Sequence, residues 1–380
     1  MAKIIVLGAG MVGSAIALDL STDHLVSVAD RSQPALERVI KRNPLIKSIA
    51  CDLGNVKELQ QLLQPFDLVV CAVPGFMGYK TLEAIIESGK HVVDISFFPE
   101  NAFALQPLAI ERGVTAIVDC GVAPGMDNII LGRYNETMEL TSFECLVGGL
   151  PLVKKWPFNY KAPFSPVDVI EEYTRPARYV ENGNIITKAA LSDVEHVFID
   201  GVGTLESFNS DGLRSILFTM PHIPNLKEKT LRYPGHVAQI MALRDAGFFA
   251  NEPIEINGTS ISPLAFTSKV LFKEWKLGAS EEELTVMRVN LEGKEKSTGL
   301  KQSITYNLHH TYDKSLQLSS MATSTGYTAT AAANLILQGL FNEVGVFPPE
   351  LIGKYEPCFQ FILDYLAQRN IHYVKTVSAS

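Results

Sequence analysis

The chain has 380 residues, of which 47% are hydrophobic and 19% are charged, and its formal net charge is −8 at pH 7. This composition excludes disorder and collagen-like structure as descriptions of the whole chain, and the acidic balance argues against non-specific nucleic-acid binding, which needs a basic face. The length predicts two domains, or one large domain with an insertion.

The first thirty residues carry the strongest signal. Residues 3–7 are a short apolar run rich in β-branched side chains, which predicts a buried parallel strand. A helical segment at 14–20 and a second strand at 25–29 follow a glycine-rich turn, Gly8-Ala9-Gly10-Met11-Val12-Gly13. In a GxGxxG dinucleotide site the three glycines allow a tight turn, close approach of the pyrophosphate and close helix–strand packing. The N-terminus of the helix then binds the phosphates.

Asp30 ends the second strand, twenty residues after Gly10. An acid at this spacing accepts hydrogen bonds from the adenosine ribose hydroxyls. Because its charge would repel the 2′-phosphate of NADP, the sequence favours NAD. Arg31 could stack on the adenine or reach a phosphate. The alternative is a glycine turn in a Rossmann-like domain that binds no dinucleotide.

Strands and helices alternate up to about residue 120. Predicted strands cover 47–51, 67–73, 91–96 and 115–119, and predicted helices cover 56–63, 79–88 and 105–112. This order predicts an α/β fold with a Rossmann-type doubly wound parallel sheet, whose ligands bind beyond the C-terminal strand ends. The candidate cofactor-binding residues at those ends are Asp52, Leu53, Ala72, Val73, Pro74, Ser96 and Cys120. Asp52 would face the adenine amino group or, alternatively, cap a helix.

After Gly121 the pattern changes to α+β. Alternating strands such as 142–147, 185–188 and 285–291 are separated by charged segments that we expect to be solvated surface, namely 227–229, 281–283 and 292–296. An Ala-rich helix from about 323 to 340 would return to the first domain. We therefore expect a Rossmann domain of 1–122 plus about 320–350, an inserted α+β domain of 123–319, and a C-terminal helical tail of 351–380.

The remaining features argue for a cytoplasmic protein. Five cysteines, an odd number, form no CxxC pair, so we expect no disulfide framework and no metal site. The N-terminal apolar run meets glycines at once, unlike a signal peptide, and no apolar run reaches the roughly 20 residues that span a bilayer. We expect neither a membrane nor a nucleic-acid partner.

Several stretches together resemble the saccharopine dehydrogenase family, and within it the lysine 6-dehydrogenase branch. They are Gly8 to Gly13, Val118 to Met126, Gly148 to Pro151, Glu171 to Arg178 and Thr230 to His236. The resemblance covers residues 1 to about 340 and implies a Rossmann domain with an inserted α+β domain, homodimerisation through that domain, and oxidation or reduction at a C–N bond of an amino acid. Val167, in Ser165-Pro166-Val167, stands where saccharopine reductases resembling this chain carry an Arg, which fits a substrate with fewer carboxylates.

Oxidation of the lysine ε-amine by NAD would yield the 6-semialdehyde, which cyclises to piperideine-6-carboxylate, and ammonia. Such a site needs one acid/base group and one anchor for the α-carboxylate. Glu100, where the resemblance also implies an acid, is the first candidate for contact with the amine; the alternative is a solvated loop acid. Asp94 ranks lower because it lies inside a strand, and Asp127 would cap a helix or face the pocket.

The second group of candidates lies in the predicted inserted domain. Arg232 offers a planar fork for a carboxylate, or a structural ion pair. His236 is a candidate proton shuttle, or a satisfied structural residue. Tyr173 and Arg175 are further substrate-binding candidates, with packing as the alternative. The competing functions are a saccharopine or diamine dehydrogenase, and a non-catalytic NAD-binding sensor or scaffold.

Overall fold

The computed structural model describes residues 1–162, 166–278 and 281–379 and divides them between two compact units. Unit 1 consists of Met1–Glu139, Glu295–Thr298 and Met321–Tyr373. Unit 2 consists of Leu140–Lys294, Gly299–Ser320 and the end of the chain from Val374. Neither unit is one continuous stretch, so the chain passes between them several times.

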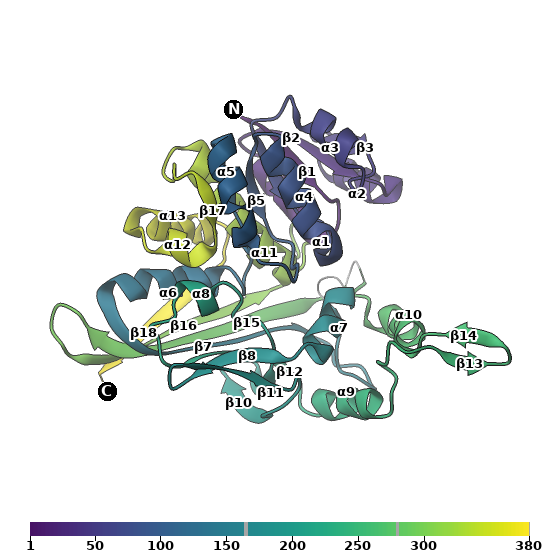
Figure 1. The fold of residues 1–380 in the computed structure, drawn as a ribbon, viewed down its shortest axis with the longest axis vertical. Helices are drawn as coiled ribbons and strands as arrows, with labels where there is room; N and C mark the ends of the chain where they lie inside the picture. The colour runs from purple at the N-terminus through teal and green to yellow at the C-terminus, as the bar shows by residue number, and fades with distance from the viewer. Residues whose placement is uncertain (163–165, 279–280, 380) are drawn as a thin grey trace. The chain divides into compact units, whose positions relative to one another are not determined.

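Unit 1 is built on a parallel seven-stranded sheet in the order β17-β6-β5-β4-β1-β2-β3 (Figure 1). Its strands are β1 (Lys3–Leu7), β2 (Leu25–Asp30), β3 (Lys47–Ala50), β4 (Leu68–Cys71), β5 (His91–Asp94), β6 (Thr115–Ile117) and β17 (Gly345–Phe347). Residues 4–7 of β1 and all residues of β4 are fully buried in succession, so both faces of the sheet are covered. The strand order reverses between β1 and β4, and in such sheets ligands bind at this switch point.

The helices of unit 1 connect these strands. They are α1 (Met11–Leu20), α2 (Gln33–Arg42), α3 (Val56–Leu63), α4 (Gly75–Glu87), the 3-10 turn η1 (Ala102–Leu105), α5 (Gln106–Arg112), α6 (Met126–Thr137), α11 (Ser320–Leu337), α12 (Pro349–Gly353) and α13 (Glu356–Ala367). Leu59, Leu82 and Ala109, from α3, α4 and α5, share one core cluster with Val69 and Val92 of the sheet. The predicted fold class of this part is thereby confirmed.

Most of the Ala-rich helix α11 belongs to unit 1. A Cβ on Gly326 would lie 3.1 Å from the side chain of Ile16 in α1, and the chain then adds β17 beside β6. The unit extends beyond the expected boundaries, because it also holds α6, α12 and α13. The expected helical tail at 351–380 is only partly helical, since it ends in the strand β18 (Tyr373–Ala379).

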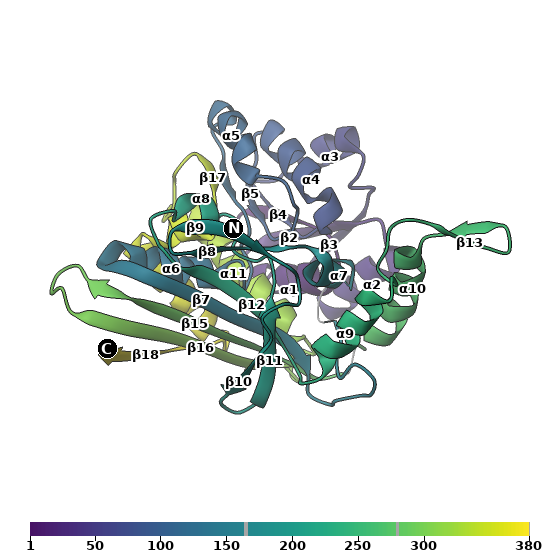
Figure 2. The same ribbon diagram turned by 60° about the horizontal axis from the view of Figure 1, so that its bottom comes forward.

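In the described residues, unit 2 contains a nine-stranded mixed sheet, seen in Figure 2, with the path β10-β11-β12-β7-β15-β16-β18; β8 pairs with β12, and β9 pairs with β8. The strands are β7 (Met138–Pro151), β8 (Ala177–Glu181), β9 (Asn184–Lys188), β10 (Glu195–Ile199), β11 (Gly203–Asn209), β12 (Leu226–Arg232), β15 (Glu283–Glu295) and β16 (Lys301–Thr311). Strands β12 and β7 are parallel, whereas β15 and β16 are antiparallel. The sheet confirms the predicted α+β character of the insertion.

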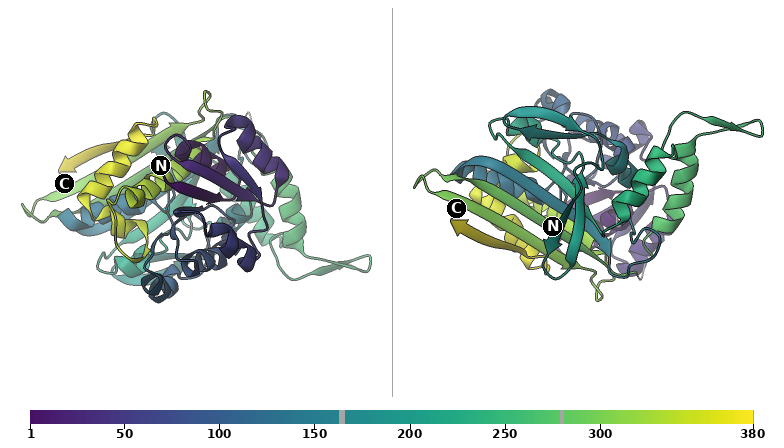
Figure 3. Two further views of the ribbon diagram at one scale, coloured as in Figure 1. Left: turned by 90° about the horizontal axis from the view of Figure 1, so that it is seen from above. Right: turned by 90° about the horizontal axis from the view of Figure 1, so that it is seen from below.

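Outside the gaps at 163–165 and 279–280, four helices and a hairpin complete unit 2. They are α7 (Pro166–Thr174), α8 (Ile216–Thr219), α9 (His236–Asp245), α10 (Pro263–Trp275) and the pair β13 (Ile254–Ile256) and β14 (Thr259–Ile261), which projects from the rest of the unit (Figure 3). Within the described ranges, no helix of either unit has the length and apolarity needed to cross a membrane.

One expectation about the surface is wrong. The segment 227–229 was expected to be solvated, but it lies in β12 between β11 and β7. Glu228 and Lys229 are 4% and 3% exposed, and the Lys229 Nζ is 2.8 Å from a Glu195 carboxylate oxygen. Glu283, in the second such segment, is also buried. Charged residues at these positions are tolerated because each has a partner in the fold.

Candidate cofactor site and catalytic groups

The turn between β1 and α1 has the geometry of a phosphate cradle. Gly8 has a φ of +106°, and a Cβ there would lie 2.5 Å from the Ala72 carbonyl oxygen. A Cβ on Gly13 would lie 2.1 Å from the Gly8 carbonyl oxygen. A Cβ on Gly10, in contrast, would meet nothing within 4 Å. The backbone of Gly10 is therefore open to a ligand at the N-terminus of α1, where Met11 and Val12 begin the helix with N–H groups that lack intrahelical acceptors.

Asp30 is tied to this turn from the end of β2. The Ala9 N–H donates to one carboxylate oxygen at 2.7 Å, and the Ser32 N–H donates to the other at 2.7 Å. A carboxylate offers about four acceptor sites, so lone pairs remain for ribose hydroxyls. The neighbouring Arg31 is exposed. These residues fit the adenosine half of a dinucleotide.

Asp52, which follows β3, was expected either to face the adenine amino group or to cap a helix. The Asp52 carboxylate accepts a hydrogen bond from the Gly54 N–H at 3.0 Å, whereas helix α3 is capped by Asn55. The alternative interpretation of Asp52 as a helix cap is therefore wrong. Leu53 is 8% exposed and belongs to the core cluster, so at most its backbone would face a ligand.

The ends of β4 and β5 are packed against each other through small residues. Ala72 continues β4 by donating its N–H to the Leu7 carbonyl, and Val73 and Pro74 lead into α4. Ser96 is 3% exposed, and its Oγ would lie 2.3 Å from a Cβ on Gly78 of α4. Only glycine at position 78 allows this approach, which fixes the path of the chain after β5.

Two buried groups flank this edge of the sheet. Asp94, the last residue of β5, is fully buried, and burial is the main cause that raises its pKa to about 7. Cys120 is also fully buried, and burial together with the charge of Asp119 raises its thiol pKa. A thiol held protonated in this way is not a nucleophile near neutrality, and a fully buried cysteine packs as a small hydrophobic residue.

Glu100 lies in the loop after β5 and is exposed. Its charge acts on Tyr79 in α4. Burial raises the pKa of Tyr79 most, followed by the charge of Glu83 and then by that of Glu100. The loop itself is anchored by Phe98, which is fully buried and packs edge-on against Tyr79 at 5.8 Å between ring centroids. Glu100 is thus a solvent-accessible acid on a fixed loop at the C-terminal edge of the sheet.

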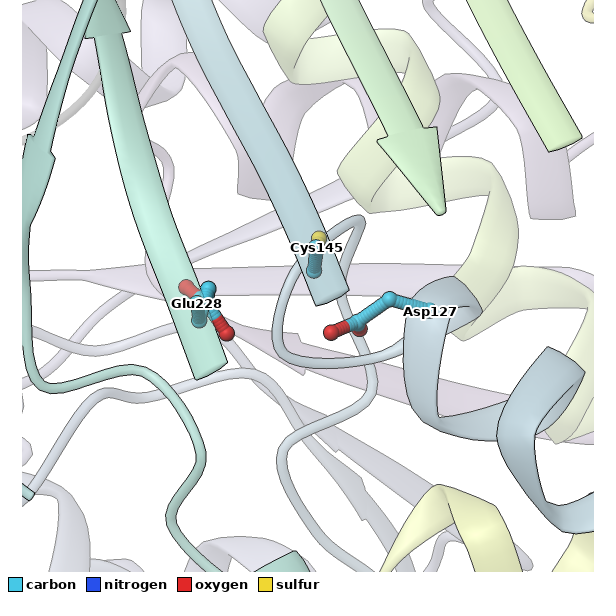
Figure 4. Close-up of side chains that lie close together, drawn as sticks. All are labelled: Asp127, Cys145 and Glu228. Atoms are coloured by element: carbon cyan, nitrogen blue, oxygen red, sulfur yellow. The ribbon is translucent and has the colours of Figure 1, made fainter. Parts of the chain in front are cut away.

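Asp127 is the second residue of α6, at the start of the helix in Figure 4. One of its carboxylate oxygens accepts a hydrogen bond from the Gly125 N–H at 2.9 Å, and the Asn128 side chain accepts from the same N–H at 3.2 Å. Asp127 therefore has the helix-start role that was one of its two interpretations, and a negative charge there is also favoured by the helix dipole.

Arg232, Tyr173 and His236 come together in unit 2, but in a buried aromatic cluster. The Arg232 guanidinium is 2.8 Å from the Glu172 carboxylate and also donates to the Tyr173 and Tyr160 hydroxyls. Its carbon lies 4.5 Å from the Tyr160 ring centroid. This geometry matches the structural ion pair considered as the alternative for Arg232, and it leaves the substrate-anchor prediction without support.

His236 is held by the same cluster. Its Nε2 is 2.9 Å from the Tyr173 hydroxyl and its Nδ1 is 2.9 Å from the Phe158 carbonyl oxygen. Burial, followed by the charge of Arg232, lowers its pKa to about 3. An imidazole with both nitrogens engaged and a lowered pKa stays neutral near pH 7. These contacts match the satisfied structural residue that was the alternative for His236.

Other sequence candidates of unit 2 have simpler surroundings. Arg175 directly follows α7 and is half-buried. It pairs with Glu171, four residues earlier in α7, at 2.9 Å.

Cys145 on β7 and Glu228 on β12 are opposite each other in the parallel register and are both buried (Figure 4). Sequence reasoning gave Glu228 no role because its charged neighbours suggested surface. Ser165, on which the comparison at Val167 partly depends, lies outside the described residues.

Comparisons with known proteins agree with the fold and with the resemblance. Residues 4–117 match the saccharopine dehydrogenase NADP binding domain and residues 121–371 match the saccharopine dehydrogenase C-terminal domain. The chain therefore belongs to the saccharopine dehydrogenase family.

Two relatives and one solved structure are informative. Saccharopine dehydrogenase [NADP(+), L-glutamate-forming] of Schizosaccharomyces pombe is 27% identical over 262 residues, 65% of this chain and 58% of that protein. Carboxyaminopropylagmatine dehydrogenase of Synechocystis is 24% identical over 380 residues, 92% of each chain. The structure of apo saccharopine dehydrogenase (L-Glu forming) from Saccharomyces cerevisiae has a TM-score of 0.81 at 20% identity over the whole of both chains. That likeness shows a shared fold.

Proposed function

We propose that this protein is an NAD-dependent dehydrogenase that acts at a C–N bond of an amino acid, with the ε-amine of L-lysine as its substrate. The observation that carries the proposal is the glycine cradle with Asp30 tied to it, in a chain of the saccharopine dehydrogenase family. A bound nicotinamide cofactor would supply the hydride acceptor. Gly8 to Gly13 would hold its phosphates and Asp30 its adenosine ribose.

The choice of NAD rests on Asp30. The matching family domain is described as NADP binding, and the Schizosaccharomyces relative is named for NADP(+). In this chain the ribose position carries a carboxylate whose two oxygens are fixed by the Ala9 and Ser32 amides. A 2′-phosphate there would face a negative charge that cannot turn away. Arg31, being exposed, is a neighbour that could compensate.

The chemistry assigns one role to Glu100. An amine must be neutral to release a hydride from its carbon, and a lysine amine has an ordinary pKa of about 10.4. An acid/base group beside the amine can take up its proton. Glu100 is an exposed carboxylate on an anchored loop at the edge where the cofactor would bind. After hydride loss the imine would add water, release ammonia and leave the semialdehyde.

Asp127, Tyr173 and Arg175 remain predictions for substrate binding. Arg175 has the most accessible guanidinium of the residues put forward as anchors, since its side chain is 22% exposed and that of Arg232 is 2% exposed. Homodimerisation through the inserted domain and a cytoplasmic location also remain predictions. Light scattering on the purified full chain tests the first of them.

The test is the initial rate of NAD⁺ and, separately, NADP⁺ reduction with L-lysine, saccharopine and ornithine at mildly alkaline pH. We expect NAD⁺ reduction with lysine and one ammonia released per NADH. Turnover with saccharopine alone would overturn the substrate and keep the fold and cofactor argument. A Glu100→Gln variant should lose most of the lysine rate and bind NADH normally, with Glu83→Gln on the neighbouring helix as the matched control.

One observation favours a second candidate. The Synechocystis relative, named carboxyaminopropylagmatine dehydrogenase, aligns over 92% of both chains, whereas the Schizosaccharomyces relative is covered over only 58% of its length. An amine that carries a carboxyalkyl substituent is therefore the alternative substrate class, and carboxyaminopropylagmatine belongs in the same assay. Silence with every substrate, in protein that binds NAD, would favour a sensor or scaffold.

A further inference from the structure

Asp94 is a buried acid whose surroundings the proposed chemistry does not use. It ends β5 at the C-terminal edge of the unit 1 sheet and is fully buried. One carboxylate oxygen accepts the Ser96 N–H at 2.8 Å and the Ser96 hydroxyl at 2.6 Å. The other oxygen is buried and has no hydrogen-bond partner within the part of the chain that the structure describes. When ionised, a carboxylate in this setting has only part of its charge compensated by hydrogen bonds.

The groups that face Asp94 from neighbouring elements supply hydrogen bonds and a like charge. Cys71 of β4 is its partner in the strand register. Hydrogen bonding by the Cys71 thiol lowers the pKa of Asp94, whereas burial, followed by the charge of Asp94, raises the pKa of the thiol. From the segment after β6, the Cys120 N–H donates to the Asp94 carbonyl at 3.1 Å, and Asp119 adds a like charge. From α4, Gly78 contributes no side chain. Among the described residues, then, these elements bring two thiols, a hydroxyl and an acid to Asp94, and no cation.

A buried carboxylate without a cation is unstable and is neutralised either by a proton or by a positively charged ligand. The nicotinamide ring carries one positive charge when oxidised and none when reduced. In a doubly wound sheet a dinucleotide lies across the strand ends at the switch point, which is here between β1 and β4, with β5 next in order. The oxidised ring and the proton would therefore compete for the same carboxylate.

We propose, on the basis of the function proposed above, that Asp94 is the counter-charge for the oxidised nicotinamide ring, ionised when the oxidised dinucleotide is bound and protonated when the reduced one is bound. Binding of the oxidised form then releases a proton from Asp94, and binding of the reduced form does not. By linkage, the preference for the oxidised form rises as the pH rises through neutrality. Ser96 keeps the carboxyl in place in both states, because a neutral carboxyl oxygen still accepts its two hydrogen bonds.

The experiment is equilibrium binding of NAD⁺ and NADH, with NADP⁺ and NADPH in parallel, to the full-length protein from pH 6 to pH 8.5. We expect the ratio of NAD⁺ to NADH affinity to rise about fivefold or more over this range. The ratio should be constant in Asp94→Asn, which keeps the acceptor for Ser96 and removes the ionisation. Asp23→Asn, an exposed acid before β2 at the opposite edge of the sheet, should behave as the wild type. The ratio also cancels any titration of the 2′-phosphate, which both NADP forms share.

A second measurement needs no variant. Titration calorimetry near pH 7 in two buffers of different ionisation enthalpy counts the protons exchanged on binding. We expect NAD⁺ to release roughly half a proton more than NADH does. Equal proton numbers, or an unchanged pH dependence in folded Asp94→Asn, would overturn the inference while leaving the proposed function in place. Folded wild-type protein that binds none of the four dinucleotides would instead overturn the proposed function, and this inference with it.

Discussion

Gly10 and Gly13 lie in the same turn, yet their surroundings differ completely. A methyl group on Gly13 would meet the Gly8 carbonyl at 2.1 Å, whereas one on Gly10 would enter open space. We expect Gly13→Ala to destabilise unit 1 by about 1–3 kcal/mol, because the backbone must move. Gly10→Ala should keep the unfolding free energy within about 0.5 kcal/mol and still lose NADH affinity by about tenfold or more, because its methyl group occupies the phosphate position. Denaturant unfolding and fluorescence titration measure the two effects.

Each variant is the control of the other. If Gly10→Ala bound NADH as tightly as the wild type, the open space in front of α1 would not be the phosphate site.

Asp30 controls the choice between the two dinucleotides. Asp30→Asn keeps an acceptor for the Ala9 amide and removes the charge. We expect the ratio of NAD⁺ to NADP⁺ affinity to fall about tenfold or more, because charged hydrogen bonds to the ribose, worth about 1.5–3 kcal/mol each, are weakened and the repulsion disappears. Titration calorimetry with both cofactors measures the ratio. Asp23→Asn makes the same charge change on the surface and should leave it unaltered; an unchanged ratio in Asp30→Asn would contradict the ribose assignment.

His236 should make the stability depend on pH. Its folded pKa is lowered to about 3, and in the unfolded chain a histidine titrates near 6.5. Below pH 6.5 the unfolded chain therefore binds a proton that the folded one does not, and stability falls by about 1.4 kcal/mol per pH unit as the pH decreases. At pH 7.5 this contribution is fully present. We expect the slope of unfolding free energy between pH 6 and pH 4.5 to be smaller in His236→Gln by that amount.

Comparing His236→Gln with a control variant distinguishes a structural role of His236 from a catalytic one. His196 is an exposed histidine of the same unit, and His196→Gln is the matched control with no expected effect on the slope. If His236→Gln instead changed the pH profile of the catalytic rate and left the stability slope unaltered, the structural role would be wrong.

At the scale of elements, Asp19 joins three helices that are far apart in the sequence. Its carboxylate, in α1, accepts from Thr330 in α11 at 2.5 Å, from Tyr365 in α13 at 2.7 Å and from Arg369 at 2.6 Å. Asp19→Ala would leave the Arg369 guanidinium, whose side chain is 17% exposed, without this counter-ion. We expect a loss of about 3–5 kcal/mol of unfolding free energy, the range for breaking a buried ion pair. Denaturant titration measures it, and Asp23→Ala, an exposed acid just after α1, should cost less than about 0.5 kcal/mol.

A double-mutant cycle of Asp19→Ala and Arg369→Met isolates the pair. If the effects of the two substitutions were simply additive, the carboxylate would stabilise unit 1 through its hydroxyl partners alone.

The elements of unit 1 could be predicted because their signals are local. The buried strands are continuous apolar runs, and Gly8 to Gly13 mark the first turn with a pattern that needs no knowledge of distant residues. The contacts of Asp19 with α11 and α13 could not be predicted, because its partners lie more than 300 residues away in the sequence and no local sequence motif marks them. For the same reason 227–229 appeared to be surface, because only the sheet order shows that β12 is an inner strand.

The candidate site divides in the same way. Asp30 and Ser96 could be placed from strand ends alone, whereas the roles of Arg232 and His236 depended on Glu172, Tyr173 and Phe158, which contact them only in the fold. From residue type alone, Arg232 was expected to bind a carboxylate and His236 to transfer a proton. The contacts favour an aromatic cluster that holds α7, β12 and α9 together.

At the scale of the whole molecule, the passage of the chain between units limits what can fold alone. Unit 1 draws its last helices and its edge strand from Met321–Tyr373. A fragment ending at Glu139 would lack β17 beside β6 and would lack all three partners of Asp19. It would also expose the surface that the fully buried side chains of α11, such as Ala331 and Leu335, cover in the complete unit. We expect the fragment to be largely unfolded or molten and to bind no NADH, although it holds the entire GxGxxG turn, Asp30 and Ser96.

The measurement is near-ultraviolet circular dichroism with an NADH titration, and the control is the same fragment joined to residues 321–373 by a flexible linker. The joined protein should regain cooperative unfolding and NADH binding, because residues 321–373 restore both the edge strand β17 and the partners of Asp19. A fragment 1–139 that unfolds cooperatively and binds NADH on its own would show that the local signals of the first domain are sufficient. Residues 321–373 would then be an addition to a complete Rossmann domain rather than a part of it.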